Sequence, residues 1–128
     1  MGKGEILLEG VGEYTVKLKT KAGDVKILLT RHLSPITVER LYKNVPLSGL
    51  TIKANDLLYI SINLEGRLER PLKKLKKGQL VFSPANKSLI IALTDLNIDF
   101  PVTPLGEVLE GMEVLRSIGT GEKVVLST

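Results

Sequence analysis

The sequence contains no cysteine and only one histidine, His32. Without cysteine the chain forms no disulfide and offers neither a thiol nucleophile nor a thiolate ligand. A zinc site built on histidines needs two or three of them, so we expect no metal site. No serine lies in the G-x-S-x-G motif of a hydrolase nucleophile. We therefore expect no catalytic triad and no cofactor, and we interpret His32 as a half-exposed residue at the end of a strand.

Long apolar runs are also missing. No stretch of 18 apolar residues occurs, so no membrane-spanning helix is expected. The opening MGKGEILLEG lacks the basic and then apolar pattern of a secretory leader, which favours a cytoplasmic location. Aromatic residues make up only 4% of the 128 positions and hydrophobic residues 43%. This composition predicts a single domain with a core of Ile, Leu and Val.

Period-two alternation of apolar and polar residues marks the first part of the chain. A short strand is predicted over Glu5–Glu9, and a half-buried strand over Glu13–Thr20. A turn at Ala22–Asp24 then leads into a returning strand over Val25–Thr30. The last two strands therefore form a hairpin.

A short helix with marked ends is predicted over Pro35–Val45. Ser34 has the hydroxyl of a good N-cap, and Pro35 suits the first helical position. Pro46 ends the helix, and Ser48-Gly49 is expected to turn the chain. One apolar stripe at helical spacing consists of Val38, Leu41, Tyr42 and Val45.

Strands resume after the helix. Ile52 and Ala54 alternate with polar residues, and in the next strand Leu58, Ile60 and Ile62 alternate with Leu57, Tyr59 and Ser61. Glu65–Lys77 breaks this pattern because it is strongly basic and contains Pro71. We interpret that segment as an exposed crossover, dispensable for folding, that Leu68, Leu72 and Leu75 anchor to the rest of the domain.

The remainder of the chain predicts three more strands and a second helix. The strands are Gln79–Ser83, Lys87–Thr94 and Leu105–Leu109, with a loop over Asp95–Thr103; a helix over Met112–Ile118 and a closing strand over Lys123–Ser127 follow. About eight short strands separated by turn residues are typical of a barrel or a sandwich.

Three segments carry a resemblance to a known family. The helix pattern P-x-T-x-x-x-L-x-x-x-x-P-x-x-G is followed here by Pro35, Thr37, Leu41, Pro46 and Gly49. Gly78–Pro84 is similar to G-D-V-A-Y-W-P, and Leu105–Leu115 is similar to I-G-R-V-x-x-G-L-E-x-L. In order and spacing, over Glu13–Ser127, the chain resembles the small prokaryotic cyclophilin-like family, which is distant from the true cyclophilins. The resemblance implies a mainly β, closed eight-stranded antiparallel barrel with a short helix over each end.

The resemblance implies prolyl isomerisation as a candidate activity, but the catalytic pattern of the true cyclophilins is missing from this sequence. True cyclophilins carry an arginine, a phenylalanine and a glutamine in a pattern like F-H-R-I-x-x-x-F-M-x-Q-G-G. The corresponding Leu50–Asn63 contains none of the three, and Lys53 is its sole cation. A compact ammonium does not replace a planar guanidinium at such a site. We therefore assign no catalytic residue.

A ligand-binding cleft is still implied by the resemblance. The family strand W-G-D-E-x-Y-F lines a cleft and reads Ala54–Ile60 here, so Asp56 and Tyr59 keep their places while Ala54 replaces a tryptophan. Ser83 replaces a second tryptophan. The candidate cleft residues are Asn55, Asp56, Tyr59, Phe82 and Asn86. The plainer alternatives are a place in the barrel core for Tyr59 and Phe82 and a turn for Asn55. Asn86 stands where the family has glycine, and asparagine tolerates the left-handed region.

The sequence supports neither a calcium site nor a nucleic-acid site. Asp95–Asp99 opens like a calcium loop, but Phe100 and Gly106 stand where the glycine and the bidentate glutamate are required. The basic segment has no aromatic residue to stack on bases, so we do not expect nucleic acid as a partner despite the net charge of +4. The sequence favours a module that binds a peptide or a small molecule. A weak prolyl isomerase, another enzyme using the same cleft, and a homo-oligomeric scaffold stay open as alternatives.

Overall fold

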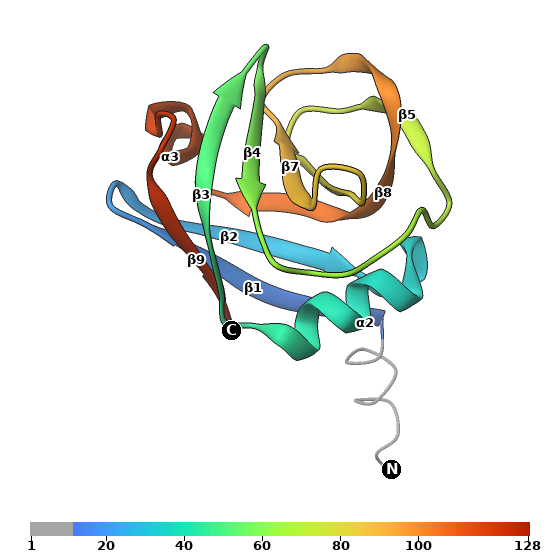
Figure 1. Cartoon of the computed structure of the whole chain (residues 1–128). Coiled ribbons are helices and arrows are strands. Elements are labelled where there is room, and N and C mark those ends of the chain that lie inside the picture. Colours follow the sequence, from blue (N-terminus) through green and yellow to red (C-terminus); the bar gives the residue numbers. More distant parts are fainter. Residues whose placement is uncertain (1–11) are drawn as a thin grey trace.

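Eight antiparallel strands close into a barrel in the computed structural model, which describes residues 12–128 (Figure 1). The strands follow one another around the barrel as β2-β1-β9-β3-β4-β7-β6-β8, and β8 returns to pair with β2. This confirms the predicted mainly β, closed eight-stranded barrel; the strand predicted over Glu5–Glu9 lies outside the described residues. The barrel strands are β1 (Glu13–Thr20), β2 (Gly23–Thr30), β3 (Leu47–Ala54), β4 (Leu57–Ser61), β6 (Gln79–Ser83), β7 (Ser88–Ala92), β8 (Leu96–Glu110) and β9 (Lys123–Ser127).

A ninth strand, β5 (Leu72–Leu75), lies outside the barrel and pairs with the first half of β8. The expected loop over Asp95–Thr103 is therefore wrong, because most of it is strand. In this half of β8 the residues Leu96, Ile98 and Phe100 are half-buried, and the residues between them are exposed. That alternation is a strand signal, but Pro101 and Pro104 obscured it.

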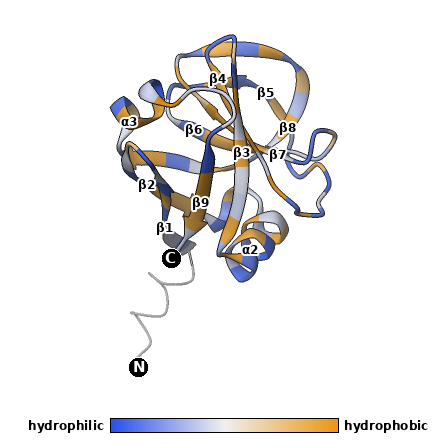
Figure 2. Ribbon diagram, turned by 60° about the vertical axis from the view of Figure 1, so that its left-hand side comes forward, coloured by the Kyte–Doolittle hydropathy of each residue, from blue (hydrophilic) through white to orange (hydrophobic). Residues whose placement is uncertain are grey.

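Apolar residues pack on both faces of part of the barrel wall. In Figure 2, hydrophobic and hydrophilic residues alternate along many of the strands. The inner core fills the barrel and includes Leu58, Phe82 and Leu105. A smaller outer cluster, covered by β5 and the first half of β8, consists of Leu57, Leu75, Val81, Ile90, Ala92 and Val102, with Tyr59, Leu72, Leu96, Ile98 and Phe100 packed against it. Both faces of β7 are consequently buried.

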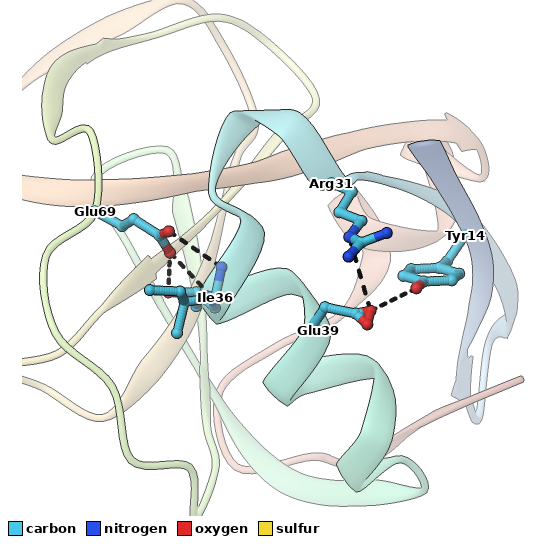
Figure 3. Close-up of polar contacts among 6 residues, drawn as sticks. Tyr14, Arg31, Ile36, Glu39 and Glu69 are labelled. Carbon is cyan, nitrogen blue, oxygen red and sulfur yellow. Dashed lines mark hydrogen bonds and ion pairs between the residues drawn. The ribbon is translucent and has the colours of Figure 1, made fainter. Parts of the chain in front are cut away.

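Helix α2 (Pro35–Asn44) closes one end of the barrel through Val38 and Leu41, both fully buried. The prediction that the Ser34 hydroxyl caps this helix is wrong, because that hydroxyl donates to the carbonyl oxygen of Leu33 at 2.8 Å. The carboxylate of Glu69 caps the helix instead (Figure 3). It accepts from the backbone N–H of Ile36 at 3.1 Å and from both the N–H and the hydroxyl of Thr37 at 2.9 Å.

The other side of α2 is fastened to β1 (Figure 3). The Tyr14 hydroxyl donates to Glu39 at 2.5 Å, and Arg31, in the short 3-10 helix η1 (Arg31–Leu33), lies 3.9 Å from the same carboxylate. The hydrogen bond to Glu39 raises the pKa of Tyr14, because the phenolate could not donate it. Tyr14 also stacks on Tyr42 with ring centroids 3.9 Å apart.

Helix α3 (Met112–Ser117) covers the opposite end of the barrel and buries Leu115. The guanidinium of Arg116 donates to the carbonyl oxygen of Leu93 at 2.9 Å, and the Lys53 ammonium donates to the carbonyl oxygen of Arg116 at 2.5 Å. Both predicted helices are thus present, each one residue shorter than expected. Among residues 12–128, neither helix has the length and apolar character needed to cross a bilayer.

Two details of β3 differ from expectation. Ser48-Gly49 is not a turn but part of the strand, where a methyl group on Gly49 would lie 2.0 Å from the carbonyl oxygen of Ser61. Ile52 and Ala54 share a face as predicted, but it is the outer face. Ile52 is 52% exposed, whereas Thr51 is buried. The two-residue turn after Ala54 fixes this register by pairing Ala54 with Leu57.

Candidate functional site

A hollow of about 480 Å³ lies on the outer face of the barrel, between β4 and the first half of β8. Two aromatic side chains, Tyr59 and Phe100, supply its largest apolar surfaces, and both are half-buried. Polar groups surround them. The lining residues are Asn55, Leu57, Tyr59, Leu96, Asn97, Ile98, Asp99 and Phe100.

The turn between β3 and β4 places Asn55 at the rim of this hollow. Asn55 and Asp56 have φ angles of 52° and 64°, so both adopt the left-handed conformation of a tight hairpin turn. The carbonyl oxygen of Asp56 accepts from the N–H of Leu93 at 2.9 Å, which fixes the turn to the end of β7. Tyr59 follows on β4, between Ile52 and Ile90 of the neighbouring strands.

A second hollow, of about 540 Å³, adjoins the first, because Phe100 lines both. Its other lining residues are Leu68, Pro84, Ala85, Asn86 and Pro101. Asn86 is held by its side-chain amide, which donates to the Ser83 hydroxyl at 3.1 Å. The left-handed residue of this turn is Lys87, with φ 48°, and not Asn86 as the comparison with glycine suggested. We call the two adjoining hollows the outer groove.

Phe82 does not reach the outer groove. Its side chain is fully buried in the inner core, close enough to Gly66 that a methyl group there would meet its ring at 2.7 Å. The prediction that Phe82 lines the cleft is therefore wrong. Side chains alternate between the two faces of β6, and Val81 is the residue that faces the outer cluster. The aromatic residue that does line the groove, Phe100, was missed because its segment was interpreted as a loop. The alternation of Leu96, Ile98 and Phe100 was the available signal.

The groove carries open hydrogen-bonding groups and few charges. Within residues 12–128, the side chains of Asn55, Asn97 and Asp99 make no hydrogen bond or ion pair. They therefore leave carboxylate and amide oxygens, and amide N–H groups, available to a ligand. Asp99 is the single charged residue among the lining residues of both hollows.

Among residues 12–128, no arginine, lysine, histidine, serine or threonine lines either hollow; Asp99 supplies the one carboxylate and Tyr59 the one hydroxyl. Lys53, the cation of the β3–β4 pair, is directed to helix α3 through its bond with Arg116. In the described part of the chain, no cluster of three or more His, Asp or Glu side chains could hold a metal ion. The arrangement supports binding through aromatic surface and hydrogen bonds.

No protein-family model matches the sequence, and no curated protein matches it either. The solved structures that share the fold include two with less than 20% sequence identity. One is the hypothetical protein AF2241 from Archaeoglobus fulgidus, with a TM-score of 0.77 and 16% identity over 91% of this chain and 95% of that chain. The other is McbB in complex with tryptophan, with a TM-score of 0.76 and 19% identity over 88% of this chain. This chain spans 44% of the McbB chain, so the similarity concerns one part of McbB.

Proposed function

We propose that this protein is a cyclophilin-like binding module whose outer groove takes a peptide segment or a small molecule. The observation that carries the proposal is the pair of adjoining hollows that share Phe100. Half-buried aromatic rings provide apolar contact area, and the amide and carboxylate groups around them provide orientation. This combination is typical of ligand sites on proteins. Asn55, Tyr59 and Asn86 belong to the proposed site together with Phe100, whereas Asp56 lines neither hollow and only shapes the turn beside Asn55.

The dimensions of the groove favour a ligand longer than one side chain. Each hollow has a volume of about 500 Å³, within the range of small-molecule sites. A peptide lying across Phe100 would place one side chain beside Tyr59 and another beside Pro84 and Pro101. McbB, which contains a similar fold, was solved in complex with tryptophan. Tryptophan and Trp-containing peptides are therefore sensible first probes.

An NMR titration tests this proposal. A ¹⁵N-labelled protein is titrated with free tryptophan and with a set of short peptides that contain Trp, Phe or Pro. We expect shifts at the backbone amides of Asn55, Tyr59 and Phe100, and a loss of affinity of about tenfold or more in Tyr59→Ala and Phe100→Ala, because each removes an aromatic surface.

Leu109→Ala is the matched control for these variants, since Leu109 is an exposed apolar residue that lines neither hollow. It should bind each probe as the unchanged protein does. Shifts confined to other faces of the barrel, or unchanged affinity in both aromatic variants, would contradict the proposal.

The rival function is weak prolyl isomerisation in the same groove. Acceleration requires a donor held at the prolyl nitrogen as the amide twists, and binding without such differential stabilisation leaves the barrier unchanged. Because no cationic donor lines the groove, we expect at most marginal turnover of a Xaa-Pro peptide at low temperature. A kcat/KM above about 10⁵ M⁻¹s⁻¹ would establish an enzyme instead.

We also propose a cytoplasmic location. Whether copies of the chain associate can be measured. Leu50 and Ile52 are about half exposed on the outer face of β3. Sedimentation of the unchanged protein beside Leu50→Ser and Ile52→Ser variants decides between a monomer and a homo-oligomer. A dimer lost in these variants would favour the scaffold alternative.

A further inference from the structure

A third hollow, separate from the two that form the outer groove, is lined by lysine side chains. It has a volume of about 510 Å³ and lies where β5, the start of β6 and the second half of β8 meet. Lys74, Lys76 and Lys77 line it, and Glu107 is the one carboxylate among its lining residues. Three ammonium groups against one carboxylate give the hollow a net positive charge. We call it the lysine hollow.

These three ammonium groups have no partner within the described chain. Lys74, Lys76 and Lys77 make no ion pair and no side-chain hydrogen bond among residues 12–128. Lys87, in contrast, pairs with Glu65 at 3.2 Å. Like charges that share one hollow repel one another, and a bound anion would offset that repulsion.

The backbone that carries the lysines is fixed. Lys74 lies in β5, paired with β8, and the N–H of Lys77 donates to the Asp95 carboxylate at 2.7 Å. The side-chain oxygen of Gln79 accepts from the N–H of Lys76 at 3.1 Å, while the Gln79 N–H donates to the Lys76 carbonyl at 3.0 Å. A ligand would thus order three side chains but no backbone, which limits the entropy lost on binding.

The surroundings of the ammonium groups narrow the class of ligand. Leu33 and Leu72 supply an apolar floor, and Thr30 and Gln79 supply a hydroxyl and an amide. The side-chain oxygen of Gln79 accepts from the N–H of Lys76, so the NH₂ group of the same amide is available to donate to a ligand. No aromatic residue lines the hollow, so bases have no stacking surface. Phosphate oxygens are typically recognised by several positively charged N–H donors, which the three ammonium groups supply.

We propose that the lysine hollow binds a small phosphorylated molecule, such as a sugar phosphate or a diphosphate, through Lys74, Lys76 and Lys77. The hollow is large enough for more than a single phosphate ion. Glu107 opposes the anion and so weakens the site. Glu107 stands directly across from Gln79 in the β6–β8 pairing, which places its carboxylate beside the proposed phosphate position.

Calorimetric titration with sodium pyrophosphate at low ionic strength tests the proposal. We expect binding to weaken by at least about tenfold in the triple variant K74Q/K76Q/K77Q, which removes three charge-assisted contacts. The control triple variant K17Q/K19Q/K26Q removes the same net charge from exposed lysines of β1 and β2. It should retain affinity within a factor of about two, since those charges lie outside the hollow.

The Glu107→Gln variant provides a second test, in which the expected result is a gain of affinity for pyrophosphate and not a loss. It should tighten pyrophosphate binding by about twofold to tenfold, because one opposing charge is removed. No heat of binding at millimolar pyrophosphate, equal losses in the two triple variants, or unchanged affinity in Glu107→Gln would each overturn the proposal. Tighter binding of a 12-nucleotide RNA than of pyrophosphate would also overturn it, in favour of a nucleic-acid surface.

Discussion

The inner core and the outer cluster are built from the same strands but differ in how completely they are enclosed. Along β7, Leu89 and Ile91 face the inner core, whereas Ile90 and Ala92 face the outer cluster. Helices α2 and α3 close both ends of the inner core. The outer cluster is covered only by β5 and the first half of β8, which leaves the outer groove at its margin. Stability is therefore concentrated inside the barrel, and the groove that we propose as a binding site lies where the outer covering is incomplete.

The two phenylalanines give the sharpest test of this difference. Phe82→Ala should lower the free energy of unfolding by about 3–5 kcal/mol, because it opens a cavity in a sealed core. Phe100→Ala should cost less than about 2 kcal/mol, since its ring is already partly in water. Urea unfolding followed by circular dichroism measures both. Equal losses would show that the outer cluster is as tightly packed as the inner core.

Helix α2 offers the next largest expected effect. Leu41→Ala should lower the free energy of unfolding by about 2–5 kcal/mol, because Leu41 is fully buried at the end of the inner core. Ile36, on the same helix, is 52% exposed, and Ile36→Ala serves as the control with a cost below about 1 kcal/mol. A loss under 1 kcal/mol for Leu41→Ala would mean that the helix does not close the barrel.

Glu69 links the segment around the outer groove to helix α2, and its effect should be smallest. Partial burial opposes ionisation of Glu69, but the N–H groups of Ile36 and Thr37, the Thr37 hydroxyl and the charge of Arg70 outweigh it, so the pKa of Glu69 is lowered. A carboxylate with a lowered folded-state pKa stabilises the fold above its unfolded-state pKa. That contribution is lost as the pH falls through the folded-state value.

Glu69→Gln should therefore cost about 0.5–2 kcal/mol at pH 7, in the range of a lost helix cap. The difference from the unchanged protein should shrink as the pH falls through the lowered pKa of Glu69, and disappear once Glu69 itself is protonated. Glu65→Gln is the control, because among residues 12–128 the Glu65 carboxylate forms only an exposed pair with Lys87. A cost of Glu69→Gln that is independent of pH would show that the charge of Glu69 does not stabilise α2.

Local sequence signals predicted the elements whose neighbours in sequence are also neighbours in space. The β1–β2 hairpin follows from period-two alternation and a turn, although the turn consists of Lys21 and Ala22, and Gly23 and Asp24 already belong to β2. Helix α2 follows from its apolar stripe and from Pro35 and Pro46. The barrel itself came from the order of several short motifs, and the resemblance to the cyclophilin-like family remains a proposal that rests on those motifs.

Features that depend on distant partners could not be predicted. The cap of α2 comes from Glu69, 33 residues after Ile36, so the local serine gave a misleading signal. Leu72 and Leu75 do anchor the basic segment, but as part of a strand that needs the first half of β8 beside it. Leu68, the third proposed anchor, is 44% exposed. Because this segment supplies both a buried leucine and a helix cap, the expectation that it is dispensable for folding is not supported by its contacts.

The candidate site was predicted in part for the same reason. Asn55 and Tyr59 belong to a hairpin whose register the turn fixes, and the structure brings them together in one hollow. Phe82 was assigned to the wrong face because alternation gives the two faces of a strand but does not say which is inside. Phe100 reaches Tyr59 only through the path of β8 around the barrel, which no local pattern encodes.

The closure of the barrel has a consequence for its synthesis. Strand β2 needs β8 as its second neighbour, through pairs such as Leu28 with Glu107, and β1 needs β9, through pairs such as Lys17 with Ser127. The first hairpin therefore leaves the ribosome with both edges unpaired and cannot complete its ladders until nearly the whole domain has been translated. Folds dominated by such distant pairings form slowly, on a timescale of about milliseconds to seconds. During that interval the nascent hairpin presents open strand edges, which are a template for pairing with another chain.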